Sequence, residues 1–190
     1  MKNGTTTLVM ARAIRRNALQ MVHRAKASHI GSALSIADIL AVLYGRVMHH
    51  DPFNPLSQTR DRFILSKGHA CVAVYATLAE VGYIGHEDLL TYGQDFSWLM
   101  NHISHKVPGV EFSTGALGHG LPFGVGKALA EKQRAESWTT YVLLGDGEMD
   151  EGSNWEALMF SSHHRLSNLV AVIDCNNLQP RLSISGFEVA

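Results

Sequence analysis

An α/β fold built on a parallel sheet is the class that this sequence predicts. Hydrophobic residues make up 46% of the 190 positions, which supplies enough apolar side chain for a core. Two apolar segments, Thr139–Leu144 and Leu169–Asp174, flank a helical pattern, and strand, helix and strand within about 35 residues is typical of a βαβ unit. Such a unit makes its two strands parallel, and both are expected to be buried.

The first half of the chain is predicted to be largely helical. Apolar residues recur at intervals of three and four from Leu8 to Lys26, which predicts an amphipathic helix. A second helix is expected to start at Ser35, with Asp38 in the capping-box position. Arg62–Leu65 is predicted to be a short strand, and the small apolar residues of His69–Val81 predict a buried helix.

A glycine-dense segment follows the irregular stretch from Gly93 to Pro108 and leads into a helix that ends near Glu136. An interior glycine destabilises a helix by up to about 1 kcal/mol relative to alanine. The run therefore indicates that the backbone must closely approach either another helix or a ligand. Its glycines are Gly115, Gly118, Gly120, Gly124 and Gly126.

The helix of the βαβ unit is expected to begin after a turn at Gly145-Asp146-Gly147. Ser153 is its predicted N-cap, with Glu156 as the capping-box partner. Trp155 and Met159 on this helix are expected to pack in the core, as are the two cysteines, Cys71 and Cys175.

Composition argues against nucleic-acid and membrane partners. Lys and Arg number 16 against 17 Asp and Glu, so the net charge is −1 and no basic footprint is present. No apolar run approaches the ~18 residues of a membrane span, and the opening residues carry no apolar signal segment. The cysteines form no CxxC spacing, so a reducing, cytoplasmic setting is expected. Charged residues are only 17%, which indicates either a large subunit interface or a large core.

Two polar residues follow the strands of the βαβ unit. Asp146 comes just after the first strand and Asn176 just after the second, so both are expected at the carboxyl edge of the sheet, where ligands bind. Carboxylate and amide oxygens suit Mg²⁺, and the N–H groups beside Gly145 and Gly147 suit phosphate. An ordinary tight turn followed by an Asx turn explains the same spacing equally well.

Longer motifs resemble those of the transketolase family. Gly145-Asp146-Gly147-Glu148 followed by Asn176-Asn177 is similar to the thiamine diphosphate motif. The segments Ser28–Gly31, Asp61–Ala70 and Pro108–Gly120 resemble further transketolase segments, in the family's order from about residue 10 to residue 178. The closest likeness is to the N-terminal, cofactor-binding half of a transketolase that is made as a separate subunit.

The resemblance implies roles for particular residues. Asp146, Asn176 and the backbone carbonyl of Leu178 would bind Mg²⁺. Gly147 and His69 would contact the diphosphate, and Gly115 and Leu117 would lie near the thiazolium ring. His29, His69 and His102 would line the entrance for sugar substrates and transfer protons there. Glu151 would lie at the subunit interface, beside the partner's activating glutamate. Histidine suits proton transfer because its unperturbed pKa is near 6.5.

The implied activity is transfer of a two-carbon ketol unit from a ketose to an aldose phosphate, with thiamine diphosphate and Mg²⁺ as cofactors. Residues 1–190 would form a single domain, shortened at its C-terminal end, since Gln179-Pro180-Arg181-Leu182 departs from the family pattern. Catalysis would require a partner subunit carrying the pyrimidine-binding domain, in a dimer or heterotetramer.

Three alternatives stay open at this point. The chain could be a catalytically silent remnant that only pairs with another subunit. It could instead serve a related thiamine enzyme, such as dihydroxyacetone synthase or deoxyxylulose-phosphate synthase. A zinc site is the third, because the 11 histidines include His102 and His105, although no repeated thiolate spacing joins them.

Overall fold

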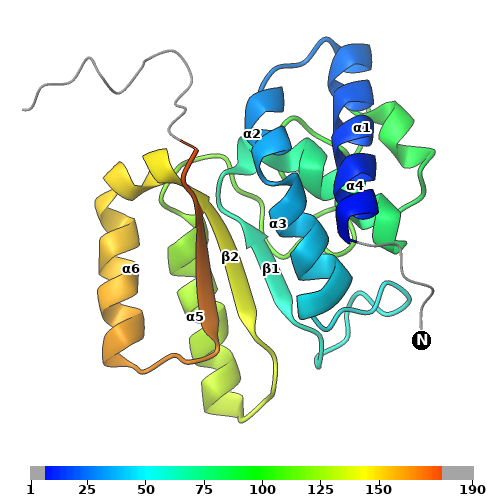
Figure 1. Ribbon diagram of the computed structural model, residues 1–190. Helices are drawn as coiled ribbons and strands as arrows, with labels where there is room; N and C mark the ends of the chain where they lie inside the picture. Colours follow the sequence, from blue (N-terminus) through cyan, green and yellow to red (C-terminus); the bar gives the residue numbers. More distant parts are fainter. Residues whose placement is uncertain (1–6, 177–190) are drawn as a thin grey trace, which may run out of the picture.

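The structure is a computed structural model that describes residues 7–176. It has three layers, a parallel sheet with a layer of helices on each side (Figure 1). Within these residues the sheet has the order β1 (Arg62–Leu65), β2 (Thr140–Gly145) and β3 (Leu169–Asp174). Both neighbouring pairs are parallel, with Leu65 beside Leu143 and Gly145 beside Asp174. Figure 1 shows α5 and α6 on one side of the sheet and α1 to α4 on the other. The predicted fold class is confirmed.

Helices account for most of the remaining regular structure. The α-helices are α1 (Thr7–Ala25), α2 (Ile30–Ser35), α3 (Ala37–Val42), α4 (Cys71–Val81), α5 (Gly120–Arg134) and α6 (Gly152–His163). A π-helical turn follows α3 at Leu43–Val47, and 3₁₀ turns occupy Gly68–Ala70, Asp88–Thr91 and Asp146–Asp150. The helices predicted from Leu8, from His69 and after the glycine run are therefore confirmed.

The sheet separates two hydrophobic cores. Alternate strand residues point to opposite faces, so Phe63 and Leu65 join the core made by α1 to α4, whereas Ile64 joins the core beneath α5 and α6. Helix α4 packs against α1, α2 and α3 and is buried almost all round, as its composition predicts. The polar site described below lies at the carboxyl ends of the strands, at the edge of the sheet that separates these two cores.

Close packing explains three glycines of the run, Gly118, Gly120 and Gly124. A Cβ atom at Gly120 would lie 2.4 Å from the hydroxyl oxygen of Ser66, and one at Gly124 would lie 2.4 Å from a methyl group of Val142. At Gly118, where φ is +75°, a Cβ would lie 2.5 Å from the hydroxyl oxygen of Ser153. Gly120 and Gly124 therefore let the start of α5 lie against β1 and β2, so the expected close approach is present but its partner is the sheet, whereas a Cβ at Gly126 would have nothing within 4 Å.

Both predicted capping boxes are wrong. Ser35 ends α2, and its hydroxyl donates to Asp174 Oδ1 at 2.8 Å, while Asp38 pairs with Arg15. Helix α6 begins one residue before Ser153, whose hydroxyl donates to the carbonyl of Gly118 at 2.7 Å. In each case the side chain makes a tertiary hydrogen bond that takes the place of the local one.

Three expectations of burial are also wrong. Strand β3 is half exposed, with Val170 at 38% and Ile173 at 41%, because it lies at an edge of the described sheet. Trp155 and Met159 are exposed on the outer side of α6, at 55% and 73%. Cys175 is exposed, whereas Cys71 is buried as expected. Apolar periodicity identifies a helix face but does not say whether a neighbour covers it.

Among residues 7–176, no helix is both long and apolar enough to cross a lipid bilayer.

Candidate functional site

A cavity of about 290 Å³ opens at the carboxyl ends of the strands. Figure 1 shows this edge at the top of the sheet, between α2 and the start of α6. Most of the residues singled out from the sequence line it, namely His29, His69, His102, Gly115, Leu117, Asp146, Gly147 and Asn176. The βαβ crossover thus brings the polar ends of β2 and β3 into one site.

One predicted site residue lies outside the cavity, and another falls outside the described residues. Glu151 is exposed at the N-terminus of α6 and does not line the cavity. Leu178, with its expected carbonyl ligand, lies outside the described residues, as does the divergent segment after Asn177. The cavity also contains three residues to which the sequence analysis gave no role, which are Ser32, Lys67 and Glu148, together with Gly145 from the predicted phosphate-binding turn.

The Asp146 side of the cavity has the donor chemistry of a cation–phosphate site. The carboxylate of Asp146 accepts the N–H of Gly147 at 3.0 Å, and the amide nitrogen of Asn176 lies 3.2 Å from Asp174 Oδ2. Carboxylate and amide oxygens beside glycine N–H groups fit Mg²⁺ and a diphosphate. Between residues 7 and 176, histidine, cysteine and acidic side chains nowhere gather in a group of three that could hold a metal ion.

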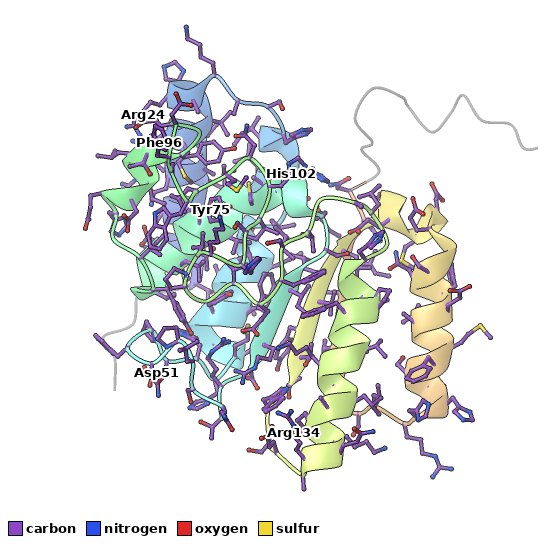
Figure 2. The ribbon with its side chains drawn as sticks, turned by 180° about the vertical axis from the view of Figure 1, so that it is seen from behind. Arg24, Asp51, Tyr75, Phe96, His102 and Arg134 are labelled. Carbon is purple, nitrogen blue, oxygen red and sulfur yellow. The ribbon has the colours of Figure 1, made fainter. Side chains whose placement is uncertain are left out.

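Three histidines, His29, His69 and His102, line the same cavity. The ring of His29 lies 5.3 Å from that of His69 and 6.4 Å from that of His102, measured between centroids. In Figure 2 His102 lies in the upper half of the molecule, below Phe96 and away from Asp51 and Arg134. His29 has a φ of +68° immediately before α2, a left-handed conformation that is uncommon for a residue with a side chain.

His69 is kept neutral by its surroundings. Burial lowers its pKa to about 4, and the neighbouring His29, Lys67 and His102 add to the effect. The Ser32 hydroxyl lies 3.0 Å from His69 Nε2 and fixes the ring by a hydrogen bond. Near pH 7 this imidazole therefore has one nitrogen that donates and one that accepts, which suits proton transfer between polar groups.

Glu148 ties the walls of the cavity together. Its side chain is almost fully buried, at 2% exposure for the residue. Oε1 accepts the hydroxyl of Ser66 at 2.7 Å and the N–H of Gly118 at 3.3 Å, while Oε2 accepts the N–H of Gly145 at 3.0 Å. One carboxylate thus joins the ends of β1 and β2 to the glycine loop. Apart from its place in the Gly-Asp-Gly-Glu motif, no sequence pattern indicated this role.

A polar, histidine-lined cavity at the carboxyl edge of a parallel sheet defines an α/β cofactor-binding domain. The particular family follows from comparison with known sequences. The family described as "Transketolase, thiamine diphosphate binding domain" matches residues 6–186. The chain belongs to the transketolase family and contains its thiamine diphosphate-binding region. The resemblance seen in the motifs is confirmed.

Curated relatives include transketolases made as separate subunits. The chain is 47% identical to an apulose-4-phosphate transketolase subunit of Phocaeicola vulgatus, over 87% of this chain and 59% of the relative. It is 42% identical to the 6-deoxy-6-sulfo-D-fructose transketolase subunit SqwG of a Clostridium species, over 89% of this chain and 62% of the relative. The chain therefore spans about three-fifths of the length of these relatives.

Solved transketolases share the fold. The enzyme of Campylobacter jejuni superposes with a TM-score of 0.89 and 34% sequence identity, over 94% of this chain and 30% of that one. The enzyme of Leishmania mexicana gives 0.88 and 35%, over 92% and 28%. Here too the likeness covers only a part of the longer protein.

Proposed function

We propose that this chain is the diphosphate-binding subunit of a two-subunit transketolase, folded as one domain. It would transfer a two-carbon ketol unit from a ketose to an aldose phosphate. The observation that carries the proposal is that one cavity is lined both by three histidines and by Asp146 and Asn176 at the carboxyl ends of β2 and β3. The names of the subunit relatives support it, since they act on different sugars within one reaction class.

In this proposal the cofactor lies along the cavity from the strand ends to the histidines. Asp146, Asn176 and the carbonyl of Leu178 would hold Mg²⁺, and Gly147 and His69 would bind the diphosphate. Gly115 lies against His102, since a Cβ there would be only 3.5 Å from that ring, and with Leu117 it would contact the thiazolium ring. The bound cofactor supplies the carbanion chemistry of carbon–carbon bond cleavage.

The histidines would handle protons and sugar hydroxyls. His69, neutral near pH 7, can accept a proton at one nitrogen while the other donates. The ring of His29 lies 5.3 Å from that of His69 and 6.4 Å from that of His102, between centroids, so the three side chains could contact the same small substrate. These three side chains would orient the hydroxyl groups of the ketose donor and the aldose acceptor.

A partner subunit would complete the site with a pyrimidine-binding domain. The exposed apolar side chains of α6, Trp155, Met159 and Phe160, form a surface that such a partner could cover. Glu151, exposed at the start of the same helix, would lie at this interface beside the partner's activating glutamate. The assembly would be a dimer or heterotetramer. The free, exposed thiol of Cys175 favours a reducing setting such as the cytoplasm.

Thermal unfolding with and without thiamine diphosphate and Mg²⁺ tests cofactor binding. Ligand at about 100 times its Kd stabilises the folded state by roughly 2.7 kcal/mol, and the rise in Tm should require both components. A cooperative transition that ignores both would contradict the proposed site.

Catalysis is tested by mixing the chain with a pyrimidine-domain partner and identifying the products. Two-carbon transfer between a ketose and an aldose phosphate supports the transketolase proposal. A chain that binds cofactor and partner without turnover is a silent pairing subunit. A different acceptor or product would identify a dihydroxyacetone synthase or deoxyxylulose-phosphate synthase reaction.

A further inference from the structure

A buried polar cluster lies behind the candidate metal site and joins three elements. Asp174 ends β3, Lys67 follows β1 and Ser35 ends α2. Lys67 Nζ lies 2.5 Å from Asp174 Oδ2, and the two side chains are only 3% and 9% exposed. Ser35 donates its hydroxyl to the other oxygen of Asp174, Oδ1, at 2.8 Å. Both carboxylate oxygens are therefore engaged by the protein itself.

The same carboxylate contacts the amide of Asn176. The amide nitrogen lies 3.2 Å from Asp174 Oδ2 and 3.3 Å from the hydroxyl of Ser35. An ionised carboxylate has only acceptor atoms, so the amide must turn its NH₂ group toward Asp174. Because the amide is planar, its oxygen then occupies the opposite corner. Asp174 thus selects one of the two orientations in which the Asn176 side chain could sit.

We propose that Asp174, balanced by Lys67, is a positioning residue that makes the oxygen of Asn176, and not its nitrogen, the ligand of the divalent cation. This inference rests on the proposed function. Asp174 itself is not a ligand in this arrangement, because Ser35, Lys67 and Asn176 occupy its oxygens. The flipped amide would point N–H groups at the cation, which repels them.

Residues that orient metal ligands from behind typically cost about 10- to 100-fold in metal affinity when they are removed. Removing Asp174 alone would leave the buried Lys67 charge without a partner and would destabilise the fold. The double variant Lys67→Met/Asp174→Leu avoids this difficulty, because apolar groups of similar volume often replace a buried ion pair without loss of stability.

The test measures Mn²⁺ binding in the presence of thiamine diphosphate by electron paramagnetic resonance, using the full chain. We expect the double variant to weaken Mn²⁺ binding by about 10-fold or more. Ser35→Ala is the matched control: it removes another contact of Asp174 and Asn176 but leaves the carboxylate, and should change the constant by less than about threefold. Unfolding without ligand reports the stability of each variant separately.

Repeating the substitutions in an Asn176→Ala background distinguishes positioning from a general effect of charge or structure. If Asp174 acts through Asn176, its removal there should change the Mn²⁺ constant by less than about twofold. Equal losses in both backgrounds, or no loss in either, would overturn the inference. If the double variant does not fold, Lys67→Met/Asp174→Asn replaces it in the same cycle, because it also removes both charges but keeps an amide in place of the carboxylate; the expected loss is about three- to tenfold.

The two proposals fail in different ways. A wild-type chain that shows no cofactor-dependent Mn²⁺ binding contradicts the proposed function and the inference together. Normal wild-type binding, with an unchanged constant in the double variant, contradicts the positioning role of Asp174 alone.

Discussion

The two ends of the sheet both bury charge, but they use it differently. At the amino end, Glu111 pairs with Arg60 and lies 3.9 Å from Arg62 and 3.7 Å from Lys127. Asp61 nearby accepts the backbone N–H groups of His49 and Thr139. At the carboxyl end, polar groups line a cavity of about 290 Å³.

A buried charge therefore does not by itself mark a functional site. The amino-end charges face one another and nearby backbone carbonyls, such as those that accept from Arg60 and Arg62. The guanidinium of Arg62 also lies 4.6 Å from the centroid of the Trp138 ring. That cluster anchors loops onto the ends of β1 and β2, whereas the carboxyl-end groups are positioned around an open volume.

The largest effect on stability is expected when the central carboxylate of the amino end is removed. Glu111→Gln should destabilise the fold by about 3–5 kcal/mol, because the buried cations lose their counter-charge. Denaturant unfolding measures the effect, with the exposed Glu87→Gln as the control. The rise in Tm on adding cofactor should persist in protein that remains folded. Loss of cofactor binding with unchanged stability would mean that the amino end also serves the site.

The carboxyl end should respond in the opposite way. Asp146→Ala removes a candidate metal ligand without opening a core cavity, so unfolding without ligand should change by less than about 1 kcal/mol. The roughly 2.7 kcal/mol of stabilisation expected from cofactor plus Mg²⁺ should vanish. Asp150→Ala, exposed at the end of the same 3₁₀ turn, should retain it. If Asp146→Ala binds cofactor as well as the wild type does, the metal site is wrong.

Glu148 should affect both stability and cofactor binding, because it is buried and also lines the cavity. Glu148→Gln places an NH₂ group against the donors of Ser66 and Gly118 or of Gly145. We expect a loss of about 1–3 kcal/mol in the free energy of unfolding, together with a smaller cofactor-dependent rise in Tm. The exposed Glu156→Gln on α6 is the control. A change in stability alone would assign Glu148 to the fold and not to the site.

The pH dependence of stability should report the half-buried His69. The folded chain protonates His69 only near pH 4, whereas the unfolded chain does so near its ordinary pKa of 6.5. Between these values the unfolded state binds more protons, so Tm should fall as the pH is lowered from about 6.5 to 4. His69→Gln should weaken this dependence, and His23→Gln on the exposed surface of α1 should not. Identical pH profiles for the wild type and His69→Gln would contradict the assignment.

The smallest effect on stability is expected on the outer face of α6. Met159 is 73% exposed, so Met159→Lys should change the free energy of unfolding by no more than about 0.5 kcal/mol. If a partner covers this face, the same change should weaken the association of the two proteins in analytical ultracentrifugation. Leu19→Lys, at a 49% exposed position on α1, is the matched control. Unchanged association would place the interface elsewhere.

Local sequence patterns were enough to predict most helices and strands, and the edge of the sheet at which the candidate site lies. Apolar periodicity located α1, and short runs of apolar residues located α4 and the three strands, because both signals are local in the sequence. Parallel strands end at one edge, so Asp146 and Asn176 could be placed together before any contact was known. The histidines of the cavity came from the family resemblance, since their spacing alone did not bring them together.

Tertiary structure alone decided which side chains support that edge. Lys67 and Asp174 are 107 residues apart in the chain, and Ser66 and Glu148 are 82 apart, so no local pattern could pair them. Ser35 and Ser153 have the local signature of helix caps, yet both donate to distant acceptors. Exposure was decided in the same way: Trp155 and Met159 are exposed because no neighbour in the described chain covers that face of α6. Hydrogen bonds and burial depend on which elements meet, and that is a property of the folded chain.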